Sequence, residues 1–469
     1  MIHPTTLMLK RYLTTYNLLG LLLLTASCTQ DESAGADSGS ENGRIEFRAA
    51  LPQLTTRATE ISGSSLANFE VSSFTIGNLS DTPYFLNKTF SKNAATGKFI
   101  SSDQKCIWPD NNESLRFIAY APSCEAMRLA GKFEETDFTF TTIADGETIA
   151  DGEYKLSNFK VAQDIASQID FITAIATGQL KDKDPEEVTL DFQHQLSRIE
   201  LKAWGASNSY DIEIAGVRLG GVATQGVFSF TSATGATDAK KGGIWESVVK
   251  GNVEYIFRDG DQIVTLDKKE SSPRSADKAV SILGAGIGGE NGYDNSAMVI
   301  PSNNAAWAYK KNADNGASDT DGMYFSVLLR VTDTTPYDNG SLIYPYSDEN
   351  DGKERVYIAV DKSSPEIVKT RVYRQGNSYF TDAAFTSAYD IEANNAEVKA
   401  YGWAALPVNA QWEPGHIYTY TLNYSDGVGL IDPRDPNPGE PIISDKVIVN
   451  VDVADWIAGS KTDVSVPRK

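Results

Sequence analysis

Cysteine and histidine are scarce in this chain, with three residues of each among 469. Thiolates and imidazoles are the usual ligands of zinc and related metals, and the sequence contains no cluster of them at ligand spacing. It also lacks a phosphate-binding glycine loop and a Gly-x-Ser-x-Gly nucleophile elbow. The sequence therefore predicts a protein that is not an enzyme and holds no metal and no cofactor.

Positive charge is in short supply, since 42 lysines and arginines stand against 63 aspartates and glutamates and the formal net charge is −21. Such a surface repels phosphate backbones, which argues against a nucleic-acid partner. It also repels anionic lipid, so attachment to a membrane should come from a covalently bound lipid and not from a basic face.

Long hydrophobic runs are few, and the apolar stretch Leu18–Leu24 is too short to cross a membrane and remain there. It follows two basic residues and precedes three small residues and Cys28. This order is typical of the secretory signal of a bacterial lipoprotein. It predicts a signal peptide over residues 1–27 and a lipid joined to Cys28 through a thioether. The small, polar residues Ser33–Gly43 then form a flexible tether.

Two cysteines remain once Cys28 carries a lipid, and they are Cys106 and Cys124. Export permits a disulfide between them, but the sequence does not establish that their geometry suits one. Two buried thiols are the alternative, because cysteine packs well in apolar cores. Both interpretations stay open at this point.

No long stretch shows the sustained apolar spacing of a helix. Short stretches in which apolar residues alternate with polar or small ones recur instead, separated by turn-forming Gly, Asn, Asp, Pro and Ser. This pattern predicts an all-β protein built from sandwiches with long loops. The predicted strands are Ile45–Leu51, Phe69–Ile76, Leu115–Tyr120, Phe138–Thr142, Val188–Phe192, Ile199–Trp204, Ile212–Leu219, Met323–Val331, Val356–Val360, Tyr418–Tyr424 and Val447–Val453.

Two proline-containing stretches divide the chain. Lys181–Glu187 is charged and predicts a hinge, with a domain boundary between residues 183 and 184. Asp432–Pro441 holds four prolines and predicts a semi-extended linker before the terminal segment 442–469. Residues 232–303 show only weak strand signals, and we interpret them as insertions in the second domain.

Several short motifs resemble the fimbrillin family, the pilins and associated lipoproteins of type V pili in Gram-negative anaerobes. Each motif is weak alone, but their order extends along most of the chain. The resemblance implies two transthyretin-like β-sandwich domains in tandem and a role in building, anchoring or capping a surface fimbria. The motifs are the lipidation site Cys28, Thr55–Thr59, Ile107–Pro109, Leu115–Pro122, Asp170–Ala174, Phe192–Ile199, Trp412–Tyr420 and Asp455-Trp456.

The resemblance also implies how such a protein assembles. In fimbrillins an Arg-specific surface protease removes the first strand of the lipidated precursor, and the C-terminal segment of a neighbouring subunit fills the opened groove by strand addition. Here the cut is expected between Arg57 and Ala58, in a polar loop after the predicted strand Ile45–Leu51. Arg48-Ala49 is the same dipeptide, but it lies inside that strand.

The candidate donor strand carries four valines on one face, and the proline-rich linker before it would let it leave its own body. Its valines are Val447, Val449, Val451 and Val453. The alternative is that this segment is the closing strand of the second sandwich. The sequence does not choose between a donor strand and a closing strand.

The expected organisation is a lipidated tether and propeptide strand at 28–57, sandwich domains at 58–183 and 184–441, and the terminal strand segment at 442–469. The large second domain favours a tip or accessory subunit over a stalk. Expected partners are other fimbrillin subunits, outer-membrane lipid through Cys28, and a receptor on a host or bacterial surface. The expected location is the outer-membrane surface and the fimbrium.

Two other classes of function stay open. A surface glycan-binding lipoprotein of a nutrient-uptake system would keep its anchor and expose coplanar aromatic rings. Its candidate rings are Trp307, Tyr309, Trp403 and Trp412. A secreted hydrolase would need a cleft with paired carboxylates, and the sequence singles out no such pair.

Overall fold

The computed structural model describes residues 43–50, 66–111, 113–131, 139–179, 188–231, 242–250, 254–269, 271–283, 296–308, 322–346, 354–436, 438–444 and 446–456. Cys28, Arg57 and Ala58 lie outside these residues, so their roles stay predictions. The described residues belong to one unit that begins at Gly43. No helix within them is long and apolar enough to span a membrane.

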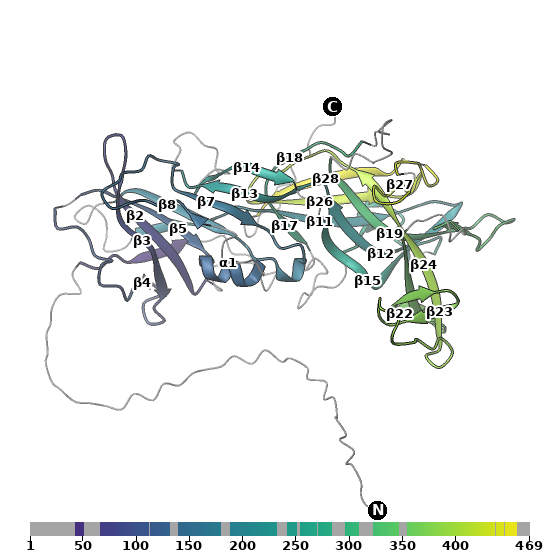
Figure 1. The fold of residues 1–469 in the computed structure, drawn as a ribbon. Helices are drawn as coiled ribbons and strands as arrows, with labels where there is room; N and C mark the ends of the chain where they lie inside the picture. The colour runs from purple at the N-terminus through teal and green to yellow at the C-terminus, as the bar shows by residue number, and fades with distance from the viewer. Residues whose placement is uncertain are drawn as a thin grey trace, which may run out of the picture. The chain divides into compact units, whose positions relative to one another are not determined.

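Strands account for nearly all of the regular structure, which confirms the all-β prediction (Figure 1). The helical elements within the described residues are short, and the longest of them, α1, has eight residues. They are α1 (Cys124–Gly131), η1 (Ile165–Ser167) and η3 (Ala276–Lys278).

The first sheet has eight strands and is built mainly from the first half of the chain. Its order places the first strand between two partners instead of at an edge. The order is β10 (Gln193–His194), β8 (Ile172–Gln179), β5 (Leu115–Ala121), β2 (Asn68–Thr75), β3 (Thr82–Lys92), β4 (Phe99–Ile100), β1 (Phe47–Ala50) and β9 (Val188–Asp191).

The last strand belongs to a five-stranded sheet, which Figure 1 shows with β11, β26 and β28 side by side. The order is β16 (Val280–Ser281), β11 (Ser197–Trp204), β26 (His416–Asn423) and β28 (Ile448–Asp455), and β17 (Ala297–Val299) also pairs with β11. β28 is therefore an edge strand, with its one strand partner on the β26 side.

A nine-stranded sheet contains most of the remaining strands of the second half. Its main path is β15 (Tyr255–Leu266), β12 (Tyr210–Gly220), β19 (Tyr324–Asp333), β24 (Ala396–Pro407), β21 (Arg355–Asp361), β22 (Ser364–Gln375) and β23 (Ser378–Phe380). Two short strands pair at its sides, β20 (Leu342–Tyr344) with β19 and β27 (Leu430–Ile431) with β24.

Two smaller sheets complete the fold, and one of them joins strands from both sides of the predicted domain boundary. A four-stranded sheet has the order β14 (Ile244–Lys250), β13 (Ala223–Ser229), β7 (Lys155–Lys160) and β6 (Thr139–Phe140). β18 (Asn303–Asn304) pairs with β25 (Ala410–Gln411). Since β7 pairs with β13, backbone hydrogen bonds connect the segments before and after residue 183. The division into two domains stays a prediction.

Residues 232–303 contain more regular structure than their sequence predicts, because β14, β15, β16 and β17 all lie within them. β15 is a twelve-residue strand that pairs with β12 through two register shifts. In the middle of β15, Gly260 adopts a φ of +83°, which glycine reaches without steric cost. The sequence signal for β15 is weak because a bulge resembles a turn in sequence, and the interpretation of residues 232–303 as insertions in the second domain stays a prediction.

Candidate functional site at the first and last strands

The first strand, β1, supplies an aromatic side chain to the core of the eight-stranded sheet. Phe47 is fully buried, and its ring meets Phe90 at 4.7 Å and Phe117 at 5.0 Å between centroids, both edge to face. Ile45, just before the strand, is 1% exposed and belongs to the same apolar cluster. Burying one such side chain stabilises a fold by roughly 1.5–3 kcal/mol.

Backbone hydrogen bonds hold β1 on both sides. It runs parallel to β9 in the register Phe47↔Val188 to Ala50↔Asp191, and it meets β4 at Phe99. Excision of β1 would therefore leave unpaired backbone groups on β4 and β9 and an apolar groove where Phe47 lay. A groove with those two properties fits an incoming β-strand.

The last strand, β28, pairs with a strand of its own chain. All eight of its residues pair with β26, from His416↔Asp455 to Asn423↔Ile448. The valines at 447, 449, 451 and 453 are half-buried and pack against the large apolar cluster, whereas Ile448 on the other face is 46% exposed. The alternation predicted from sequence is therefore present in an edge strand whose valine face packs on the core.

A tryptophan directly after β28 fixes the end of this strand. Trp456 is 1% exposed and stacks on His194, with ring centroids 4.3 Å apart and planes 3° apart. Nδ1 of His194 lies 2.8 Å from an Asp170 carboxylate oxygen, and both residues are buried. The backbone N–H of Trp456 donates to the carbonyl of Gly415 at 2.6 Å. His194 belongs to β10, so Trp456 ties β28 to the eight-stranded sheet.

The proline-rich stretch 432–441 is not a semi-extended linker, and that prediction was wrong. The N–H of Ile431 donates to Glu440 O at 2.8 Å, and the N–H of Gly439 donates back to Ile431 O at 3.0 Å. The N–H of Ile442 then donates to Gly429 O at 3.1 Å. The chain therefore folds back on itself before β28, because backbone and side-chain partners outweigh the extended preference of proline.

Buried charges anchor this folded stretch to the body. Asp432 is 1% exposed and accepts hydrogen bonds from Ser326 and from Arg434, the latter at 2.9 Å. Arg434 also forms an ion pair with Glu254 at 2.9 Å. Removing one member of such a network leaves a buried charge without its partner, which is strongly destabilising. The sequence does not predict this network, and its one local signal is the alternation of charged residues and prolines in 432–436.

A family model for fimbrillin-like proteins matches residues 56–320. The chain belongs to the fimbrillin-like family. No curated protein matches this chain. Among solved structures it is similar to a fimbrial protein from Bacteroides vulgatus, with 13% identity, a TM-score of 0.47, and coverage of 88% of this chain and 100% of that one. It is also similar to a candidate cell adhesion protein from Bacteroides uniformis, with 14% identity, a TM-score of 0.34, and coverage of 89% and 99%.

The two cysteines of the body of this fimbrillin-like chain are thiols in different surroundings. Cys106 is buried in the cluster around Phe47, its carbonyl accepts the Ile45 N–H at 3.2 Å, and burial raises the pKa of its thiol. Cys124 begins α1 and packs against the larger cluster. Of the two alternatives left open by the sequence, the structure has separate thiols and not a bridge.

The aromatic residues considered for a glycan platform are mostly core residues. Trp307, Trp403 and Trp412 are 2%, 0% and 3% exposed, and Tyr309 lies outside the described residues. In the described part of the chain, no group of histidine, cysteine or carboxylate side chains is placed to hold a metal ion. The three buried tryptophans offer no face on which a sugar could stack.

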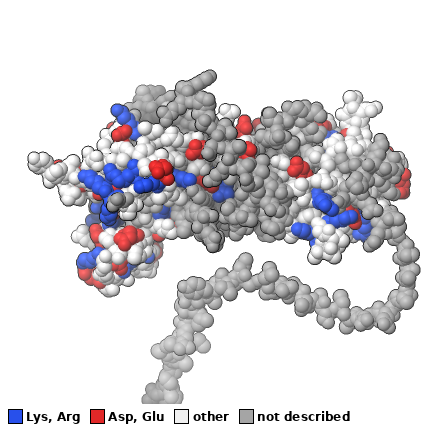
Figure 2. Space-filling view, turned by 180° about the vertical axis from the view of Figure 1, so that it is seen from behind, with Lys and Arg blue, Asp and Glu red and all other residues white. Residues whose placement is uncertain are grey.

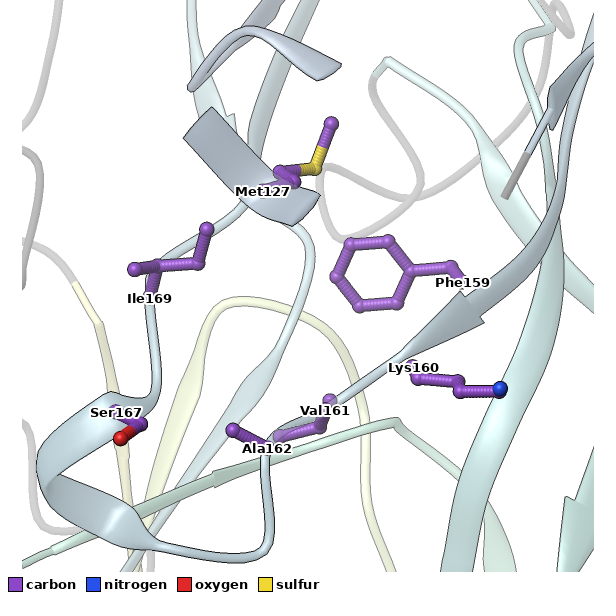
Figure 3. Close-up of a pocket in the computed structure, with 7 residues that line it drawn as sticks. All are labelled: Met127, Phe159, Lys160, Val161, Ala162, Ser167 and Ile169. Carbon is purple, nitrogen blue, oxygen red and sulfur yellow. The ribbon is translucent and has the colours of Figure 1, made fainter. Parts of the chain in front are cut away.

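A small hollow lies beside α1, and Met127, Phe159 and Ile169 are among the residues that line it. Figure 3 shows mainly apolar side chains around it, with the ammonium group of Lys160 pointing away from Met127 and Ile169. A ligand site normally needs several converging polar groups, and the polar side chains of this lining are those of Lys160 and Ser167. We do not consider it a second candidate site.

Basic side chains gather in a row on the face seen in Figure 2, with acidic side chains among them. In the nine-stranded sheet such neighbours are ion pairs: Arg371 meets Asp259 at 2.6 Å and Lys399 meets Glu213 at 2.6 Å. Pairs of this kind are weak when exposed. They join β15 to β22 and β12 to β24.

The buried network before β28 makes stability depend on pH. Burial raises the pKa of the Asp435 carboxyl to about 6, and its Oδ1 accepts the N–H of Glu354 at 2.8 Å. The unfolded value is about 3.9, so the folded state binds the proton more tightly and stability falls as pH rises through 6. Between pH 5 and pH 8 the titration of Asp435 should lower the free energy of unfolding by about 1.4 kcal/mol. The variant Asp435→Asn should not show this part of the loss.

Denaturant unfolding of the body at both pH values measures this difference. Asp452→Asn is the matched control, because Asp452 is an exposed carboxylate on β28. The control should keep the pH dependence of the wild type. An equal pH dependence in Asp435→Asn and wild type would contradict the assignment to Asp435.

Proposed function

We propose that this chain is a structural or adhesive subunit of a cell-surface fimbria that assembles by β-strand exchange, with a tip or accessory position favoured. The observation that carries the proposal is the place of β1, a core strand between β4 and β9 whose loss would open an apolar groove. Family membership supports the fimbrial role. The groove would accept a strand from a neighbouring fimbrillin subunit.

The proposed maturation begins with export and attachment of lipid to Cys28, which places the precursor at the outer-membrane surface. Cleavage between Arg57 and Ala58 then releases β1 together with the lipidated tether. The cut falls between β1 and the next described residue, Leu66, so it separates β1 from the body without breaking another described strand. The mature subunit would meet other fimbrillin subunits and, at an exposed position, a receptor on a host or bacterial surface.

Arg57→Ala should block maturation, because it removes the basic side chain at the proposed cut. The surface protein should keep its lipidated N-terminus at Cys28 and stay outside the polymer. Arg48→Ala is the matched control, since its Arg-Ala bond lies in β1 in register with Thr189, and it should mature at Ala58 as the wild type does. Mass spectrometry of the N-terminus of surface protein distinguishes the two variants.

Two results would count against this site. A mature N-terminus at Ala49 would mean that the protease cuts within β1. A start beyond Glu60 would mean that a different bond is used. Retention of lipidated Cys28 in wild-type fimbriae would instead indicate an anchor subunit, and retention without any fimbriae would favour the glycan-binding lipoprotein.

A further inference from the structure

We infer that β28 is a permanent strand of this chain, so that the subunit accepts a neighbour's strand without giving up β28 in return. The inference rests on the proposed strand exchange and names which side of it this chain occupies. It decides between the donor strand and the closing strand that the sequence left open.

The strand itself is fully engaged. Each of its eight residues has a partner on β26, and β26 in turn runs parallel to β11 over seven register pairs from Arg198↔Ile417 to Trp204↔Asn423. The valine face of β28 packs on the large cluster that also holds the core of the nine-stranded sheet. Withdrawal of β28 would expose this cluster along the length of the strand.

The C-terminal end of β28 also contacts the eight-stranded sheet. Trp456 is buried and stacks on His194, and its backbone N–H donates to the carbonyl of Gly415. His194 is in turn paired with the buried carboxylate of Asp170. If β28 left, Trp456 would have to leave with it. The His194–Asp170 pair would then lose the ring that shields it from water, and the aromatic stacking would be lost.

The described chain shortly before β28 is held to the body by hydrogen bonds. The N–H groups of Val428 and Gly429 donate to the carbonyl of Ser444 at 3.1 and 3.3 Å. The fold between these residues is closed by the pairing of Leu430 with Pro441 and anchored by Asp432 and Arg434. Reaching a neighbouring subunit would require these contacts to break before the strand could move.

β1 differs from β28 in its length and in its position relative to the candidate cleavage site. It has four residues, and the candidate cleavage site follows it in the chain. Both strands must break their contacts to leave, but a cut at Arg57 would detach β1 from the body covalently and make its loss irreversible, whereas β28 remains joined to the body through the chain before it. The two ends of this chain are therefore suited to different roles, with an acceptor groove under β1 and a fixed strand in β28.

A disulfide that locks β28 to β26 tests the inference. His416 and Asp455 face each other in register, and their side chains meet at 3.3 Å. In the double variant His416→Cys, Asp455→Cys, the two cysteines stand directly opposite each other on paired antiparallel strands, and the Cβ spacing of such a pair suits a disulfide. The variant is expressed in the native host, and its incorporation into purified fimbriae is measured under oxidising conditions. The matched controls are the same variant kept reduced and the single variant His416→Cys.

Equal incorporation of locked, reduced and wild-type chains supports the inference. Loss of incorporation in the locked chain alone, restored by reduction, would overturn the inference and leave strand exchange intact. Failure of the wild-type chain to enter fimbriae would overturn the proposed function and the inference with it. Hydrogen exchange adds a second readout: the β28 amides should keep the same protection before and after cleavage at Arg57, and a large loss on cleavage would contradict a permanent strand.

Discussion

Phe47→Ala should lower the free energy of unfolding of the uncleaved precursor by about 3–5 kcal/mol. Phe47 is fully buried against three other phenylalanine rings, so its truncation leaves a cavity in the centre of the apolar cluster. The same substitution cannot affect a mature protein that starts at Ala58, because β1 has been removed from it. Denaturant unfolding of both forms gives the two values.

Arg48→Ala is the control for this experiment, since Arg48 lies in the same strand with an exposed side chain. It should change the stability of the precursor by less than about 1 kcal/mol. A precursor that tolerates Phe47→Ala without loss would show that β1 does not fill a groove, and the acceptor role would lose its physical basis.

Trp456→Ala should cost about 3–5 kcal/mol of unfolding free energy and should increase hydrogen exchange along β28 first. The reason is that Trp456 buries the largest side chain of the C-terminal segment and holds it against His194. Trp456→Phe keeps an aromatic ring that can stack, so it should recover a good part of the lost stability.

Ile448→Ala is the matched control at the other end of the strand, because Ile448 is 46% exposed on the outward face. It should leave both stability and exchange close to wild type. If Trp456→Ala were equally mild, Trp456 would not be fastening β28, and the closing strand would be held by its valines alone.

Much of the strand pattern could be predicted from local sequence. β28 shows strict alternation because one face packs on the core and the other meets water. β5 was also predicted from the alternation of apolar residues with polar or small ones, although the fold buries all seven of its residues, Arg116 included. In these strands the surroundings agree with the local pattern.

Other strands could not be predicted from local sequence, because their pattern depends on distant partners. β24 was not predicted, because its two faces pack on different apolar clusters. Both faces are therefore apolar, and the sequence shows no alternation of apolar and polar residues. β22 was missed because most of its side chains are partly or fully exposed, so polar residues interrupt it. β15 was missed because its central bulge has the composition of a turn.

The sequence by itself determined the all-β class, the place of the first strand, the alternating valines of the last strand and the motifs of the fimbrillin-like family. Only the tertiary structure decided that β1 lies inside a sheet and that β28 closes its own sheet. It also decided that the proline-rich stretch folds back through Asp432 and Arg434. The physical reason is separation along the chain: Trp456 meets His194 and Asp170, and Arg434 meets Glu254, across distances that no local pattern records. Local periodicity fixes which face of a strand is apolar, whereas the identity of the surface that covers it depends on the whole fold.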